Sequence, residues 1–233
     1  MTYFADSFSE AIKLLTTFDQ EVYSIILLSL FVSFTSTLIS TLIGVPLGLS
    51  LGMKSFKGKG FVTRVIYTLM SLPPVVVGLA VAIILSRRGA FSSFRLLYTP
   101  TAMIIAQMVL VTPIVTGIVF NAAKANGEGI KRVCRTLGGK RWDVMWLLIS
   151  ELKINILIAV VTGFGRAVSE VGAVMIVGGN IKYHTRVMTT YIAMNNGMGN
   201  YAAALAMGLV LLGISFIVNT ALYQFGMVIK DEN

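Results

Sequence analysis

Charged residues are scarce in this sequence of 233 residues. Asp, Glu, Lys and Arg make up 12 % of it, whereas they make up about a quarter of an ordinary soluble domain. Cys134 is the only cysteine, which excludes an intrachain disulfide and a metal site built from several cysteines. His184 is the only histidine, so one chain cannot offer a metal a pair of imidazoles. We therefore expect neither a metal site nor a cofactor.

The sequence also lacks the phosphate-binding pattern G-x-x-x-x-G-K-[ST], so any ATP-driven function requires another subunit. Ser150 and Lys153 match the S-x-x-K motif of serine-nucleophile enzymes. The S-D-N and K-T-G motifs that accompany it in those enzymes are absent. We expect no catalytic residue in this chain.

Hydrophobic residues dominate instead, at 56 % of the sequence and a mean hydropathy of +0.83. They fall in runs long enough to cross a bilayer, which takes about 20 residues of helix. Backbone polar groups in lipid must be paired within the protein, so each run is expected to be helical. The sequence therefore predicts an all-α, polytopic membrane helical bundle with five transmembrane helices. The predicted spans are residues 22–53, 62–85, 101–121, 154–177 and 201–225.

Small residues recur in the first predicted span. Gly44, Gly48 and Gly52 stand at intervals of four and share one helical face. Such a face lets another helix approach closely. The partner is either a helix of the same chain or one of a second subunit, and the spacing fits both.

Basic residues show which side of the membrane each loop faces. Loops 54–64 and 124–153 carry more Lys and Arg than the loops opposite, so they are predicted to be cytoplasmic. The N-terminus then lies outside and the C-terminus inside the cell membrane. Most of the net charge of +9 is thus a topology signal. Because no basic helix is interleaved with base-stacking aromatics, nucleic-acid binding is not expected.

The loop 124–153 has the pattern of a helix–turn–helix. Two helix-compatible stretches flank Gly138 and Gly139, and glycine accepts a positive φ without steric cost. Leu137 and Trp142 place apolar side chains beside the turn. The pattern predicts a projecting element on which a cytosolic partner docks.

Several segments resemble a known family. Residues 135–142, Arg-Thr-Leu-Gly-Gly-Lys-Arg-Trp, resemble the coupling loop of type-I ABC importer permeases. Residues 71–78 are similar to the L-P-P-V-V-x-G segment of the molybdate, tungstate and sulfate permeases, and residues 163–192 look most like tungstate permeases. The resemblance covers about residues 22 to 226.

This resemblance implies a homodimeric permease with a cytosolic ABC ATPase and an extracytoplasmic substrate-binding protein as partners, surrounded by membrane lipid. The cargo it implies is an oxyanion: tungstate first, then molybdate, then sulfate. The implied organisation is an extracytoplasmic segment, a transmembrane domain with its coupling loop, and a cytoplasmic tail, over residues 1–21, 22–226 (loop 124–153) and 227–233. The implied ATPase-coupling residues are Arg135, Thr136, Leu137, Gly138, Gly139, Arg141 and Trp142.

The coupling loop departs from the family pattern at both ends. Arg132-Val133-Cys134 stands where the pattern has Glu-Ala-Ala, which puts one polar contact of the loop in doubt. Ser150-Glu151 stands where the pattern has Leu-Pro. Without that proline, we expect the helix after the loop to continue unbroken into the fourth span.

Arg166 and Glu170 lie within the fourth predicted span, at a spacing that places them on one helical face. Charges at this depth must be paired or face water. The pair either neutralises itself and packs the helix, or lines the translocation path or its gate. Prolines within the second span can bend it and shape the same path. The candidate path or gate residues are Arg166, Ser169, Glu170, Pro73 and Pro74.

Two other classes of membrane protein compete with an ATP-driven permease. A transporter driven by an ion gradient often shows inverted repeats and helices broken at the membrane midplane. No internal repeat is evident in the sequence, which counts against that class. An intramembrane enzyme would need a nucleophile–base pair or a metal cluster within the spans, and neither is visible.

Overall fold

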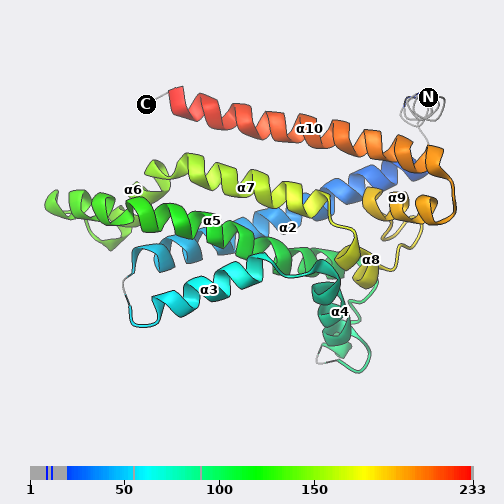
Figure 1. Ribbon diagram of the computed structural model, residues 1–233, viewed down its shortest axis with the longest axis horizontal. Helices are drawn as coiled ribbons and strands as arrows, with labels where there is room; N and C mark the ends of the chain where they lie inside the picture. Colours follow the sequence, from blue (N-terminus) through cyan, green and yellow to red (C-terminus); the bar gives the residue numbers. More distant parts are fainter. Residues whose placement is uncertain (1–8, 10–11, 13–19, 55, 90, 232–233) are drawn as a thin grey trace. The chain divides into compact units, whose positions relative to one another are not determined.

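The computed structural model describes residues 9, 12, 20–54, 56–89 and 91–231, without the side chains of Arg141 and residues 225–231. Most of the predicted segment 1–21 and the end of the predicted tail 227–233 therefore lie outside the described residues. The described chain is helical (Figure 1), and its longest helices lie on the predicted apolar runs, whereas α6 and α9 lie outside them. In chain order they are α2 (Gln20–Met53), α3 (Lys59–Met70), α4 (Pro74–Leu85), the 3₁₀ turn η1 (Ser92–Phe94), α5 (Pro100–Thr136), α6 (Arg141–Glu151), α7 (Lys153–Val168), α8 (Gly172–Gly178), α9 (Met188–Gly197) and α10 (Tyr201–Asp231).

Among the described residues, α2, α5 and α10 are each long and apolar enough to cross a membrane. Two further pairs reach that length only as bent pairs: α3 with α4, bent by 93°, and α6 with α7, bent by 69°. If each bent pair is one span, the number of spans is the five that the sequence predicts, although the second pair covers residues 142–168 whereas the predicted fourth span is 154–177. The all-α membrane bundle is therefore confirmed, although two of its spans are not single straight helices.

The second predicted span breaks at its prolines. Pro73 is the N-cap of α4 and Pro74 its first residue. Proline has no backbone N–H, which an α-helix needs everywhere except in its first turn. Helix α3 therefore ends at Met70 and a new helix starts in another direction.

The expectation of an unbroken helix after the coupling loop is wrong, because α6 and α7 meet at a sharp bend at Leu152. No proline is needed for it, and both backbone groups of Leu152 itself stay paired. The Leu152 N–H donates to the Leu148 carbonyl at 2.9 Å, and the Leu152 carbonyl accepts from the Ile156 N–H at 2.9 Å. Leu148 and Leu152 are both buried.

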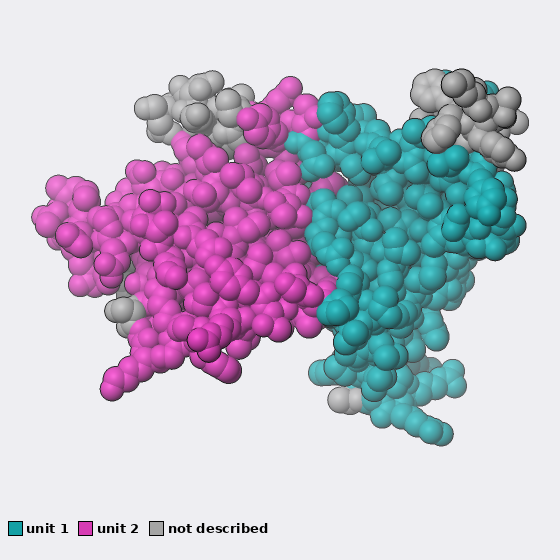
Figure 2. Space-filling model, in the orientation of Figure 1, with its two compact units in different colours: residues 1–36, 73–107, 165–219 teal, residues 37–72, 108–164, 220–233 magenta. Residues whose placement is uncertain are grey.

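The contacts divide the chain into two compact units (Figure 2). Unit 1 holds residues 1–36, 73–107 and 165–219, and unit 2 holds residues 37–72, 108–164 and 220–233. Helices α2, α5, α7 and α10 each contribute residues to both units.

Unit 2 is built on the close approach of α2 to α5, which lie side by side (Figure 1). A Cβ on Gly44 would lie 3.0 Å from the Val115 side chain, and one on Gly48 would lie 2.8 Å from the Thr116 carbonyl oxygen. A Cβ on Gly52 would lie 2.7 Å from the Cβ of Ala123. The glycine ladder thus packs against a helix of the same chain, which decides between the two partners that the sequence allows.

Unit 1 is held by polar contacts at the start of α2. The Glu21 carboxylate accepts from Lys182 at 2.6 Å and from Arg186 at 2.9 Å, joining α2 to the loop between α8 and α9. The hydrogen bond from the Lys182 amine to the Glu21 carboxylate raises the pKa of Lys182, which keeps the amine charged. About two turns further along α2, the Met188 N–H at the start of α9 donates to the buried Ser29 hydroxyl at 2.8 Å.

We predict that Gly48→Ala destabilises the chain by about 1–3 kcal/mol, since the added methyl group overpacks the contact with the α5 backbone. The matched control is Gly213→Ala on α10, where nothing lies within 4 Å of the added atom. The control should be as stable as the parent or gain up to about 1 kcal/mol of helix propensity. Thermal unfolding of the purified chains in one detergent measures both. A Gly48→Ala chain as stable as the control would contradict the close approach.

Candidate functional site

The predicted turn in the coupling loop is present between α5 and α6. Gly138 adopts φ +81°, a conformation that favours glycine. The Gly139 N–H donates to the Cys134 carbonyl at 2.9 Å, and a Cβ on Gly139 would overlap the Cys134 thiol. The first glycine is thus required by its backbone angle and the second by its close contact with the end of α5.

Helix α6 starts with its own cap. The Asp143 carboxylate accepts from the Lys140 N–H at 2.6 Å. A carboxylate in the first turn also offsets the positive end of the helix dipole. The direction in which α6 leaves the turn is therefore fixed locally, by the glycine pair on one side and Asp143 on the other.

The turn buries one face and exposes the other. Cys134, Val144 and Leu148 are buried, and they hold the ends of α5 and α6 within unit 2. Leu137 is 83 % exposed and Trp142 is 78 % exposed, as predicted for a docking element. Arg135 and Thr136 are also exposed, while the side chain of Arg141 lies outside the described part of the structure.

One residue of this surface was missed in the sequence. Trp146 is 70 % exposed and stands four residues after Trp142, on the same face of α6. Its spacing from Trp142 was the signal that could have identified it. An exposed pair of tryptophans on one helix is typical of protein-binding surfaces, in which tryptophan is enriched.

The charged pair forms as predicted, with Arg166 Nη2 3.2 Å from Glu170 Oε2. Its setting differs from the prediction, because α7 ends at Val168 and Glu170 lies beyond the helix. The expectation of one continuous helix over 154–177 is therefore wrong. The Arg166 side chain is 34 % exposed and that of Glu170 only 3 %.

Glu170 joins three helices in unit 1. Its side chain pairs with Arg166 in the last turn of α7, and its Oε1 accepts from the Ala173 N–H at the start of α8 at 3.0 Å. Its backbone carbonyl accepts from the Thr189 hydroxyl of α9 at 2.8 Å. The carboxylate thus caps α8, which follows the interruption of the helix after α7, and this gives the buried group a structural role.

The other candidate gate residues occupy different places. Ser169 turns back on its own helix and donates to the Gly165 carbonyl at 2.8 Å. Pro73 and Pro74 start α4, which packs tightly on α8: a Cβ on Gly78 would lie 2.6 Å from the Cα of Ala173. The prolines thus position the helix that supports α8, the same helix that Glu170 caps.

Gln107 is a further polar residue of unit 1 that the sequence reasoning missed. It is buried in α5, accepts from the Ser36 hydroxyl of α2 at 2.7 Å and donates to the Ala167 carbonyl of α7 at 2.9 Å. Its signal was a lone amide within an apolar run. It ties the end of α7, just before the break, to two long helices. Within the described residues, no group of three or more His, Cys, Asp or Glu could hold a metal ion.

We predict that Glu170→Ala destabilises the chain by about 1–3 kcal/mol, because it leaves the Ala173 N–H without its acceptor in a buried position. Glu170→Gln keeps an acceptor and loses only the charge, and the Arg166 left without its partner is one-third exposed, so we expect a smaller loss than in Glu170→Ala. Thermal unfolding of the three purified chains separates the two contributions. Equal losses in both variants would contradict the cap as the main contribution of Glu170.

Comparison with known proteins places this architecture in a family. Residues 44–226 match the family model described as "Binding-protein-dependent transport system inner membrane component". The chain is 54 % identical to the tungstate uptake system permease protein TupB of Peptoclostridium acidaminophilum, over 96 % of this chain and 98 % of the relative. It is 38 % identical to the TupB protein of Campylobacter jejuni, over 94 % and 92 %.

A solved structure shares the fold. A chain from inward-facing conformations of the MetNI methionine ABC transporter superposes with a TM-score of 0.72, covering 93 % of this chain and 96 % of that one. At 17 % sequence identity this match shows the fold alone. The family match and the long, highly identical relatives lead to one conclusion: the chain belongs to the inner membrane components of binding-protein-dependent transport systems.

Proposed function

We propose that the chain is the permease subunit of an ATP-driven importer that carries tungstate across the cytoplasmic membrane. The observation that carries this proposal is the 54 % identity to a tungstate permease along almost its entire length. Molybdate and sulfate are the alternative cargoes. A substrate-binding protein that delivers the cargo would set most of the specificity, so competition among these oxyanions measures the complete system.

The proposed ATPase contact is the exposed surface of the α5–α6 turn. Leu137, Trp142 and Trp146 offer three large apolar side chains beside a positively charged helix end. The excess of Lys and Arg in loops 54–64 and 124–153 supports a cytoplasmic position for this turn. The N-terminus then faces the substrate-binding protein on the opposite side of the membrane.

A continuous path along which movement can be transmitted runs from the α5–α6 turn to the interruption between α7 and α8. Helix α6 leads through Leu152 into α7, whose last turn carries Arg166. Glu170 then links α7 to α8 and α9. ATP-driven closure of the ATPase would move the turn, and α7 would pass that movement to the helices that Glu170 joins. Two copies of the chain would enclose the path between them.

Within this proposal Arg166, rather than Glu170, is the group of the pair that can meet the cargo. Its side chain is one-third exposed, whereas the carboxylate is buried. A free guanidinium would hold an oxyanion tightly, because it offers it paired hydrogen bonds. The neighbouring Glu170 lowers that affinity, so the cargo can leave. Ser169, Pro73 and Pro74 shape the surroundings of this pair in the proposed gate.

Uptake by proteoliposomes tests the function. The chain is reconstituted with its ATPase and binding protein, and tungstate inside the vesicles is measured with ATP, without ATP, and with an imposed proton or sodium gradient. We expect uptake that requires ATP and ignores the gradients. Uptake that follows a gradient and needs no ATP would contradict the proposal and favour a secondary transporter.

A matched pair of variants in the same assay tests the docking surface. The double variant Leu137→Ala, Trp142→Ala should lower ATP-driven uptake at least about tenfold, since large apolar side chains at the centre of an interface contribute most of its affinity. Phe56→Ala removes another exposed apolar side chain, from the loop 54–58, and should leave uptake unchanged. Similar losses in both would show that the turn has no special part in docking.

A further inference from the structure

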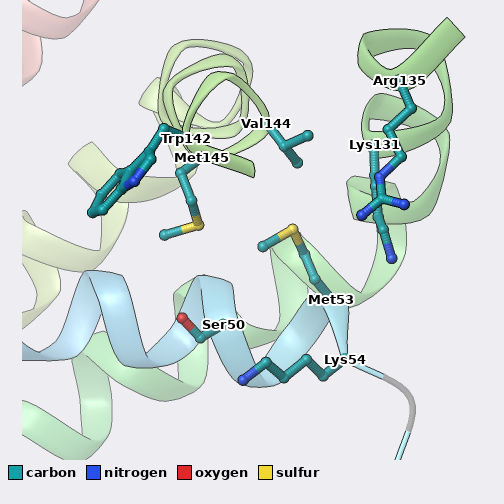
Figure 3. Close-up of a pocket in the computed structure, with 8 residues that line it drawn as sticks. All are labelled: Ser50, Met53, Lys54, Lys131, Arg135, Trp142, Val144 and Met145. Carbon is teal, nitrogen blue, oxygen red and sulfur yellow. The ribbon is translucent and has the colours of Figure 1, made fainter. Parts of the chain in front are cut away.

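A cavity of about 580 Å³ lies within unit 2 beside the coupling turn, and it shares Arg135 and Trp142 with the exposed surface of that turn (Figure 3). Its walls come from the end of α2, the last turns of α5 and the start of α6. The size is in the range of small-molecule sites, about 300–1,000 Å³. The lining residues are Ser50, Met53, Lys54, Lys131, Arg135, Trp142, Val144 and Met145.

The polar part of the lining is strongly positive. Lys54 follows α2 directly, and Lys131 and Arg135 stand one turn apart on α5. Within the described residues, the salt bridges formed by carboxylates join other cations: Arg166, Lys182 and Arg186. Glu128 lies with Lys131 and Arg135 around an adjoining hollow but forms no salt bridge with either among the described residues. Cations gathered around one cavity attract an anion. A group with several acceptor oxygens satisfies their donors best.

The rest of the lining is apolar. Figure 3 shows Met53 of α2 and Met145 of α6 directed toward one another, with Trp142 on the side away from Lys131 and Arg135. Methionine is flexible and adapts to irregular apolar ligands. The side of the cavity at Lys131 and Arg135 thus suits an anionic group, and the side of the methionines and Trp142 suits a hydrocarbon chain; Figure 3 shows Lys54 directed toward Ser50, away from the other two cations.

We propose that this cavity binds a phosphate-like oxyanion, carried by the headgroup of an anionic phospholipid or free in solution. The apolar lining favours the phospholipid. So does the position, because the apolar run of α2 ends at Met53 and Lys54 follows, as at the border between hydrocarbon and headgroups. Basic pockets between membrane helices on the cytoplasmic side bind such headgroups. The proposed orientation of the chain in the membrane decides only that the phospholipid lies in the cytoplasmic leaflet.

A bound phospholipid would join α5, whose Lys131 and Arg135 would hold its phosphate, to the apolar residues that α2 and α6 contribute to the cavity at the base of the coupling turn. It would offset the mutual repulsion of Lys131 and Arg135, which share one face of α5. The ligand would thereby hold the turn in the position that it presents to a partner. This effect goes beyond the proposed transport function and does not depend on the cargo.

Native mass spectrometry of the full-length chain in mild detergent tests the lipid source. Phosphatidylglycerol or phosphatidylcholine is added to the parent, to the variant Lys54→Gln, Lys131→Gln, and to the control Lys57→Gln, Lys124→Gln. The control removes the same charge from exposed lysines that do not line the cavity. We expect the parent and control to retain phosphatidylglycerol over phosphatidylcholine. The cavity variant should bind phosphatidylglycerol about 25-fold more weakly, about fivefold for each cation removed.

Titration calorimetry of delipidated chain with inorganic phosphate and with tungstate tests the free source. Binding of either anion that the cavity variant loses and the control keeps, without preference for phosphatidylglycerol, would assign the cavity to a free oxyanion. Equal retention of both lipids by all three chains, together with no anion binding that depends on the cavity lysines, would overturn the proposal. The comparison of the two lipids on the parent needs no variant, so it stands even if a substitution unfolds the chain. Neither readout involves transport, so failure of the proposed function would leave them unaffected.

Discussion

The rest of the structure depends on one constraint: in an apolar chain, each interruption of a helix leaves backbone N–H and C=O groups that must find partners within the protein. The chain meets it differently at each break. At Leu152 the N–H and the carbonyl of the bend residue both keep helical partners. At Pro73 and Pro74 the missing N–H groups fall in the first turn of α4, where no helical partner exists for them. After Val168 the carboxylate of Glu170 takes the free N–H of Ala173.

Helix interruptions whose backbone groups have hydrogen-bond partners explain how a rigid helical bundle can contain a connection that moves. A bend whose central residue keeps both backbone hydrogen bonds, as Leu152 does, is a place where the angle between two helices can change while that residue stays paired. A break held by one side chain, as at Glu170, transmits force to every helix which that side chain contacts. In the proposed transporter the first lies next to the ATPase contact and the second beside Arg166. The tight ladder at Gly44, Gly48 and Gly52 keeps α2 and α5 together meanwhile.

Sequence reasoning succeeded where a residue type has one structural use. The turn at Gly138 and Gly139 was predicted because glycine accepts a positive φ, which Gly138 adopts; the close contact of Gly139 with Cys134 was not predicted. It failed at the break between the end of α7 and the start of α8. Both points lie within one apolar run, so composition alone could not locate the break. The pairing of Arg166 with Glu170 followed from their spacing. The contacts of Gln107 with α2 and α7 could not, since they join residues far apart in the chain.

The most direct test of the account is a crosslink from the coupling turn. Because Cys134 is the only cysteine, a Cys134→Ala chain accepts one new thiol at a chosen place. Leu137→Cys and Tyr183→Cys are both exposed positions, on the turn and in the loop between α8 and α9 respectively. With a short thiol-to-amine crosslinker and the co-expressed ATPase, the account predicts a permease–ATPase product from Leu137→Cys alone. A product from Tyr183→Cys, or none from an accessible Leu137→Cys, would contradict it.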